Sequence, residues 1–182
     1  MNRGYHEIKE HGKREFPFNI YPCSIPVDFS HVALHWHEEM EIIAVKKGRG
    51  RITVDTVSYP VEEGDILAVF PGQLHAISCG NGERMEYENI IFRLSMLMGD
   101  NGDGCTVHFL KPLQEGQAKN PVLIQRNQPD HEVFGKVIQE LDRFSEIRGN
   151  GYQLAVKGQL FLFLYYAYGR GILFTEKKPG HA

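Results

Sequence analysis

Short hydrophobic runs alternate with polar, turn-forming segments over the first two thirds of the chain. Polar segments such as "KKGRG" and "EEGD" supply glycines that can adopt positive φ angles. Many short β-prone runs at intervals of about 8 to 12 residues predict an all-β barrel or sandwich. The candidate strands are "HVALHWH", "MEIIAV", "RITVDTVSYPV", "DILAVF", "HAISC", "YENIIFRL", "TVHFL" and "PVLIQ".

The pattern changes to helical spacing after Arg126. Asn127, Pro129 and Asp130 suit the start of a helix, because a proline fits the first turn and an acidic charge favours the positive end of the helix dipole. Apolar residues then recur every three or four positions, which predicts one apolar face from about 130 to 147. They are Phe134, Val137, Ile138, Leu141 and Phe144.

A second helix is predicted from about 152 to 168, after the break "RGNG" at 148–151. Its second half is apolar on nearly all sides, and such a helix needs cover on more than one face. The barrel can cover one face. A second copy of the chain is the expected cover for the other, so the sequence predicts a homodimer built on this helix. The aromatic residues of this segment are therefore interpreted as core or interface: Phe161, Phe163, Tyr165, Tyr166 and Tyr168.

These patterns divide the chain into four parts. We expect a charged N-terminal arm at 1–15, a β-barrel at 16–126, a helical pair for dimerisation at 127–170, and the start of a linker at 171–182.

Composition and charge narrow the class of protein. The net charge is −3 and no block of Lys and Arg follows the chain, which argues against a self-sufficient nucleic-acid-binding domain. Three cysteines without a CxxC pair fit a reducing compartment. The N-terminus lacks the apolar core of a signal peptide, and the run "LFLFLYYAY" is too short for a bilayer that needs about 20 residues. The sequence therefore predicts a cytoplasmic protein without a membrane span.

The run "HWHEEMEIIAVKKGRG" carries the candidate chemistry. His35, His37 and Glu41 are separated by even numbers of residues, so they share one face if the run stays extended. His75 follows the predicted strand "DILAVF" and the turn "PGQ". Three imidazole nitrogens and one carboxylate oxygen form a ligand set suited to one divalent metal, Zn, Ni, Fe or Mn. These four residues are the predicted metal ligands and the predicted ligand-binding residues.

The spacing of these residues is similar to the two cupin motifs. The first motif is matched by His35, His37, Glu41 and Gly48, and the second by "GDILAVFPGQLH". Two departures are present. Phe29 stands where the first motif has a glycine, and the proline and glycine of "PGQ" are adjacent instead of separated by one residue.

A longer resemblance covers about 16 to 170. The segment from "HWHEEMEII" to "FPGQLHAI", followed by "NIIFRLSML", "FLKPLQEG" and the two helices, resembles the N-terminal sensor domain of AraC-type transcription regulators. The resemblance implies a mainly β fold: a cupin (double-stranded β-helix or jelly-roll) barrel followed by a C-terminal pair of α-helices. It also implies a small-molecule effector, such as a sugar or related metabolite, and a homodimer. DNA binding is expected only through a helix-turn-helix domain that is not within these 182 residues.

Three interpretations of the four residues stay open: a self-satisfied polar network, a metal site, or a direct binding site for an organic effector. The leading function is effector sensing and dimerisation without catalysis, and the alternative is a metal-dependent cupin enzyme such as a dioxygenase or sugar isomerase. Of the neighbouring residues, Trp36 is expected to pack on the opposite face. Glu38, Glu39, Arg51 and His31 are expected at the rim or surface.

Overall fold

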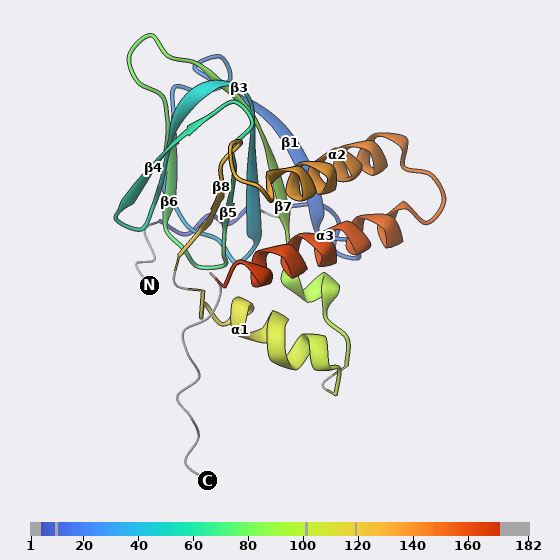
Figure 1. The fold of residues 1–182 in the computed structure, drawn as a ribbon. Coiled ribbons are helices and arrows are strands. Elements are labelled where there is room, and N and C mark those ends of the chain that lie inside the picture. The colour runs from blue at the N-terminus through green and yellow to red at the C-terminus, as the bar shows by residue number, and fades with distance from the viewer. Residues whose placement is uncertain (1–4, 10, 101, 119, 172–182) are drawn as a thin grey trace.

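The computed structural model describes residues 5–9, 11–100, 102–118 and 120–171. It shows a β-barrel with a helical hairpin packed against one side and a shorter helical segment below it (Figure 1). The strands are β1 (Phe18–Ile25), β2 (Val32–His35), β3 (Met40–Val54), β4 (Val57–Glu62), β5 (Ile66–Val69), β6 (His75–Ser78), β7 (Met85–Phe92) and β8 (Val122–Ile124). The helices are η2 (Leu94–Leu97), η3 (Thr106–Leu110), α1 (Lys111–Gln114), α2 (His131–Ile147) and α3 (Tyr152–Gly169).

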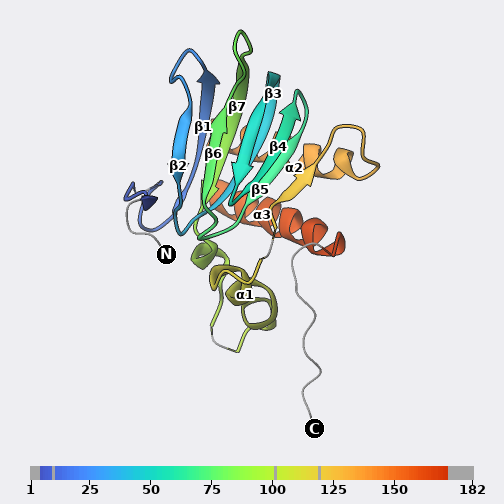
Figure 2. The same cartoon turned by 90° about the vertical axis from the view of Figure 1, so that its left-hand side faces the viewer.

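The long strand β3 belongs to both sheets of the barrel. Its first part pairs with β7 and β5, in the order β1-β7-β3-β5-β8, and its second part pairs with β4 and β6, with β2 beyond β6. All of these pairs are antiparallel. The strands run side by side in Figure 2. The predicted fold class, a mainly β cupin barrel followed by two helices, is confirmed.

Gly48 lies where β3 passes from one sheet to the other. Its φ angle is +76°, and the pairing of β3 with β7 shifts register between Val45 and Lys47. A Cβ atom at this position would lie 2.1 Å from the carbonyl oxygen of Arg84. Only glycine fits this close approach, which explains why the strand can bend here without leaving the ladder.

The first sheet is buried on both faces. One core fills the barrel and includes Ile43, Val45 and Leu67, whereas the other lies between the outer face of the sheet and the helices and includes Ile42 and Ala44. Residues 40 to 45 of β3 are all buried because successive side chains point into these two cores in turn.

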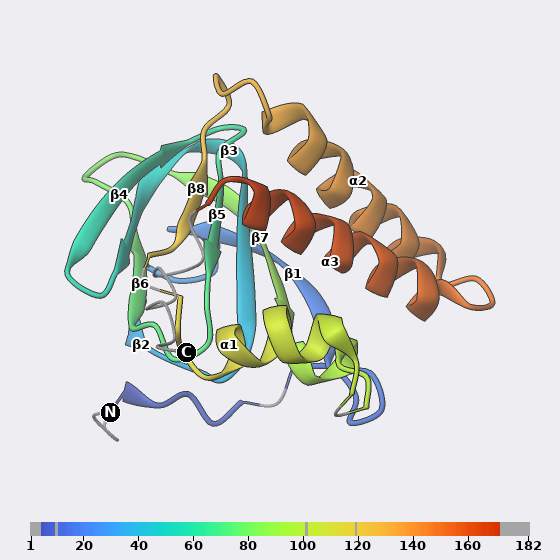
Figure 3. The ribbon, with the colours of Figure 1, turned by 60° about the horizontal axis from the view of Figure 1, so that its bottom comes forward.

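Helices α2 and α3 form an antiparallel hairpin along the barrel (Figure 3). Their observed bounds match the predicted helices at about 130–147 and 152–168. The apolar face of α2 is buried, and Arg148 ends the helix in the left-handed conformation with a φ angle of +46°. Within the described residues, neither helix nor any other is long and apolar enough to cross a membrane.

The predicted strand "TVHFL" is wrong. This segment is a turn of π-helix, η3, which continues into α1. The carboxylate of Asp103 accepts hydrogen bonds from the backbone N–H and the hydroxyl of Thr106, at 2.8 and 2.6 Å. This cap starts a helix where alternation of side chains alone favours a strand.

The described part of the N-terminal arm lies on the barrel. The N–H of Trp36 donates to the carbonyl of Tyr5, the N–H of Glu7 donates to the carbonyl of Trp36, and the ring of His6 stacks on the indole. Residues 1–4 and 10 of the predicted arm lie outside the described residues, as do residues 172–182 of the predicted linker.

Candidate metal and effector site

Four side chains converge where β2 ends and β3 and β6 begin. His35 closes β2 and is the cross-strand partner of His75, which opens β6, and Glu41 is the second residue of β3. His37 lies in the connection between β2 and β3. One ligand atom from each of the four lies within 4.8 Å of every other. The structure therefore brings together all four of the predicted residues, although their function stays a prediction.

The convergence does not arise from one continuous strand. The chain bends at Glu38 and Glu39 between β2 and β3, so the shared parity of His35, His37 and Glu41 is carried through a turn. The turn residue Gly72 fixes the neighbouring segment, because its N–H donates to the carbonyl of His37 at 2.9 Å. This hydrogen bond holds the segment that ends in His75 against the segment that contains His35 and His37.

The site is closed on most sides and open at His35. The side chains of His37 and Glu41 are 2% exposed and that of His75 is fully buried, whereas the side chain of His35 is 19% exposed. A ligand that reaches the group from solvent therefore meets His35 first.

Each of the three histidines is oriented by a backbone carbonyl two residues away. The Nδ1 atoms of His35, His37 and His75 lie 2.9, 3.1 and 2.9 Å from the carbonyl oxygens of Ala33, Glu39 and Gln73. A carbonyl oxygen only accepts, so each Nδ1 carries the hydrogen and donates. In the neutral imidazole, Nε2 is then the atom with the free lone pair.

Two of these Nε2 atoms face the same carboxylate oxygen. The Oε2 atom of Glu41 lies 2.9 Å from Nε2 of His37 and 3.0 Å from Nε2 of His75. Three lone pairs cannot stabilise one another without a positive charge between them. Either the two imidazoles are protonated at Nε2 or a cation lies among the three atoms.

Electrostatics favour positive charge at this point. Burial by itself raises the pKa of Glu41, but the charge of His75 and the hydrogen bonds from His37 and His75 outweigh burial and hold that pKa far below its usual range. Burial lowers the pKa of His75, yet the Glu41 carboxylate raises it above its usual value. Burial and the neighbouring His75 lower the pKa of His35.

The donor set fits a divalent metal. One ring nitrogen from each of the three histidines and one carboxylate oxygen lie within 4.8 Å of one another, so they can contact one ion at bond lengths of about 2.0 to 2.2 Å. Each imidazole is also held at Nδ1 by a carbonyl, which is the outer-shell support that histidine ligands generally have. An organic effector bound directly would not require the four ligand atoms to share a centre.

Glu39 was expected at the rim, and that expectation is wrong. The residue is buried, and its Oε1 accepts a hydrogen bond from Nε of Arg93 at 2.8 Å. Its Oε2 lies 3.8 Å from Nδ1 of His37, so the ion pair lies directly behind a site residue. No local signal marks it, because Arg93 lies 54 residues away along the chain.

Two more residues that the sequence did not single out support the site. Gln73 accepts the Nδ1 hydrogen of His75 through its carbonyl and binds the N–H of Phe70 through its side chain at 2.8 Å. Glu7, from the arm, has its Oε2 3.7 Å from Nε2 of His35. The position of Gln73 within "PGQLH" could have suggested its role, whereas nothing in the arm could have suggested that of Glu7.

The other neighbours lie as expected. Trp36 points away from the site and contacts the arm, and Glu38 is exposed. His31 is exposed and pairs with the hydroxyl of Ser30, and Arg51 is an exposed strand residue near Ser58. None of these side chains joins the four convergent ones.

Residues 26–164 match the AraC-like ligand binding domain family. The chain belongs to this family. The match covers most of the barrel and extends into α3, so it includes both motifs and the hairpin.

A curated relative is the uncharacterized HTH-type transcriptional regulator YdeC of Bacillus subtilis (strain 168). The two are 27% identical over 88 residues, which are 48% of this chain and 30% of YdeC. The chain thus matches less than a third of the length of that relative.

Similar solved structures include a cupin 2 conserved barrel domain protein from Salinispora arenicola CNS-205. It has 24% identity and a TM-score of 0.40 over 44% of this chain and 66% of its own. An RmlC-like cupin from Methanocaldococcus jannaschii has 19% identity and a TM-score of 0.38 over 47% and 72%. Bacillus subtilis oxalate decarboxylase, described with Mn(II) centres, has 25% identity and a TM-score of 0.32 over 35% and 18%.

Proposed function

We propose that this chain is the effector-sensing and dimerisation domain of an AraC-type transcriptional regulator, with a metal-containing effector site in the barrel. Family membership supports ligand binding. The observation that carries the metal is the meeting of two Nε2 lone pairs on one buried carboxylate oxygen, at 2.9 and 3.0 Å.

His35, His37, Glu41 and His75 would hold the ion. A divalent metal supplies a point of positive charge at which oxygen donors of a small molecule bind. The chain contributes the rest: the carbonyls of Ala33, Glu39 and Gln73 fix the imidazoles, and the open side at His35 admits the effector. A sugar or related metabolite suits such a site, because its hydroxyl groups are oxygen donors.

The exposed face of α3 would form the dimer. Leu154, Phe161, Leu162 and Tyr165 are exposed large hydrophobic residues at helical spacing, with Gly158 among them. A nearly apolar groove of about 380 Å³ runs along this face. A second copy of α3 would cover these residues, and the small Gly158 would allow the two helices to approach closely.

Sensing requires that the effector favours one arrangement of the hairpin over another, since equal affinity for both arrangements shifts nothing. DNA would be bound by a helix-turn-helix domain elsewhere in the regulator. The alternative, a metal-dependent cupin enzyme, would use the same four residues. Membership in a ligand-binding family favours the sensor.

Elemental analysis tests the metal. Protein purified without a histidine tag should contain about one divalent ion per chain, and the ion should raise the melting temperature of the chelator-treated protein. The His37→Ala/His75→Ala variant should lose both effects.

The matched control removes two exposed histidines. His31→Ala/His108→Ala changes the histidine count equally but leaves the site intact, so its metal content should equal that of the unchanged protein. A metal-free parent protein whose melting temperature does not respond to Zn, Ni, Fe or Mn would show that the site holds no metal.

A further inference from the structure

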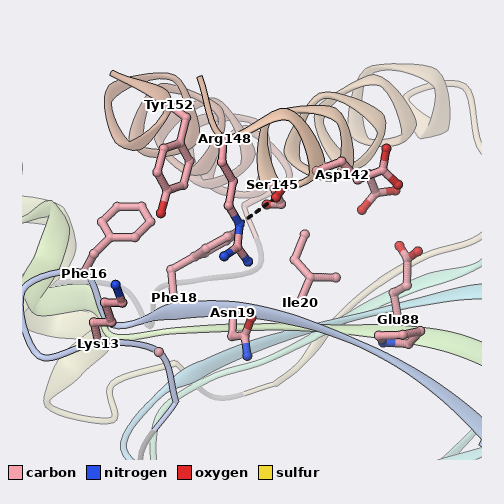
Figure 4. A pocket seen from close by; sticks show the side chains of 13 residues that line it. Lys13, Phe16, Phe18, Asn19, Ile20, Glu88, Asp142, Ser145, Arg148 and Tyr152 are labelled. Carbon is pink, nitrogen blue, oxygen red and sulfur yellow. Dashed lines mark hydrogen bonds between the residues drawn. The ribbon is translucent and has the colours of Figure 1, made fainter. Parts of the chain in front are cut away.

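A cavity of about 590 Å³ lies outside the barrel, between the first sheet and the helical hairpin. Figure 4 shows its lining: side chains of β1 and β7 below, and side chains of α2 and the start of α3 above. The sheet contributes residues of the outer face, such as Ile20, which pairs with Ile90. Glu41 lies on the inner face, so this cavity is separate from the barrel site. Its volume is within the usual range of about 300 to 1,000 Å³ for small-molecule sites.

One end of the cavity is cationic. The guanidinium of Arg148 points from the C-terminal end of α2 into the cavity, and Lys13 lines the same end from the arm (Figure 4). Nε of Arg148 donates to the carbonyl of Ser145 at 2.9 Å, which fixes the side chain, while its terminal nitrogens have no partner within the described residues. A planar guanidinium with free terminal N–H groups is suited to a carboxylate.

Arg148 occupies a position that glycine would fill with less strain. Its φ angle is +46°, and it caps α2 through its own N–H to the carbonyl of Phe144. Residues with a Cβ atom are uncommon in this conformation, and helices that end this way usually have glycine there. A ligand bound by the guanidinium would explain why an arginine occupies this strained backbone position.

The other end of the cavity carries the carboxylates of Glu88 and Asp142, which pair with Lys46. Lys46 pairs with Glu88 at 2.6 Å and with Oδ2 of Asp142 at 3.0 Å. Oδ1 of Asp142 and the hydroxyl of Ser145 are buried atoms without a hydrogen-bond partner among the described residues. A buried acceptor without a donor lowers the stability of the protein. A ligand with an N–H or O–H group at this end would satisfy Oδ1 of Asp142.

Aromatic rings line the cationic end of the cavity: Phe16, Phe18 and Tyr152 lie beside Lys13 and Arg148 (Figure 4). Phe16 packs edge-on against Tyr152 and tilted against Phe18, with both pairs of ring centroids 5.7 Å apart. Ile20 adds an aliphatic surface between Arg148 and Asp142 (Figure 4). Such walls accept a flat apolar ring.

We propose that this outer cavity binds a small aromatic carboxylate that carries a hydroxyl or amino group opposite its carboxylate. The carboxylate pairs with Arg148 and Lys13, the ring lies against Phe18 and Ile20, and the far group donates to Asp142. The ligand contacts the sheet and α2 together, so its binding stabilises the packing of the hairpin on the barrel.

Isothermal titration calorimetry with 4-hydroxybenzoate, and with 4-aminobenzoate as the amino analogue, tests the chemistry. Binding of at least one of them, with a raised melting temperature, is expected. Benzoate lacks the donor and phenol lacks the carboxylate, so each should bind at least about tenfold more weakly. Equal affinity for all four compounds, or no binding of either substituted benzoate, would overturn the proposal.

Arg148→Gly separates binding from folding. Glycine suits the positive φ angle, so the variant should melt no lower than the parent protein, yet its affinity for the probe should fall at least about tenfold. Arg143→Gln removes the same charge from the exposed side of α2, outside the cavity, and should leave affinity unchanged. Unchanged affinity in Arg148→Gly would contradict the proposal.

The barrel site is tested separately. Protein stripped with a chelator should bind the probe with the same affinity, because no residue of the outer cavity is one of the four barrel ligands. Loss of probe binding on stripping would place the ligand in the barrel and overturn the outer site, whereas a metal-free barrel would leave it intact.

Discussion

His75 and Glu41 form the charged centre of the barrel site, and a metal there competes with protons for the same nitrogens. Because the Glu41 carboxylate raises the pKa of His75, this histidine takes a proton at a higher pH than an ordinary histidine does. His35, whose pKa is lowered, stays neutral to lower pH. Of these two histidines, His75 is therefore the one at which protons compete with the metal at the higher pH.

We expect the affinity for Zn²⁺ to fall as the pH is lowered from 8 to 6. Each proton displaced on binding makes the dissociation constant rise by up to about tenfold per pH unit. Competition against a chromophoric chelator at a series of pH values measures this slope. His31→Ala, which removes an exposed histidine, should give the same slope. A dissociation constant independent of pH would rule out the histidine ligands.

Gly48 allows β3 to bend close to the carbonyl of Arg84. Gly48→Ala should lower the free energy of unfolding by about 3 kcal/mol, because the added Cβ atom combines a left-handed backbone with a clash against the Arg84 carbonyl. Gly82→Ala is the matched control: its φ angle is +78°, but nothing lies within 4 Å of its Cβ position. It should cost about 1 kcal/mol. Urea denaturation measures both, and equal losses would refute the role of the clash.

At the scale of elements, α3 differs from α2 in having two apolar faces. Val156, Leu160 and Phe163 are buried against the rest of the protein. Leu154 and Tyr165 are large hydrophobic residues that are 78% and 69% exposed. Exposed hydrophobic surface on a helix of this kind favours association.

Leu162→Glu should convert a dimer into monomers or aggregates, because it places a charge in the apolar groove on α3. Sedimentation velocity measures the change, and a loss of at least about tenfold in dimer affinity is expected. Gln139→Glu puts the same charge on an exposed position of α2 and should leave the dimer intact. A parent protein that is monomeric at high concentration would contradict the dimer.

At the scale of the whole molecule, charge limits what this chain does with nucleic acid. The net charge is −3, so few phosphate contacts and little counterion release are available. We expect no sequence-selective binding of duplex DNA by these 182 residues at physiological ionic strength. A gel shift that resists salt and competitor DNA would disprove this.

Much of the architecture follows from local sequence. Alternation of side chains marks most of the strands, and spacing of three or four marks α2 and α3 close to their observed ends. The set His35, His37 and Glu41 is also local, because its members are spaced by two and then four positions and the intervening bend keeps their common direction. Short-range periodicity encodes which face is buried, and that is what a sequence reports directly.

The rest depends on contacts between distant segments. Glu39 is buried because Arg93 reaches it from 54 residues away. The helix at Thr106 is a local exception, because Asp103, three residues earlier, caps it where alternation favours a strand. The outer cavity joins the arm and β1 to the end of α2, more than a hundred residues later in the chain. The hydrophobic pattern of the sequence gives the face that each segment buries. Only packing in three dimensions decides which other segment covers that face, and therefore which polar groups come into contact.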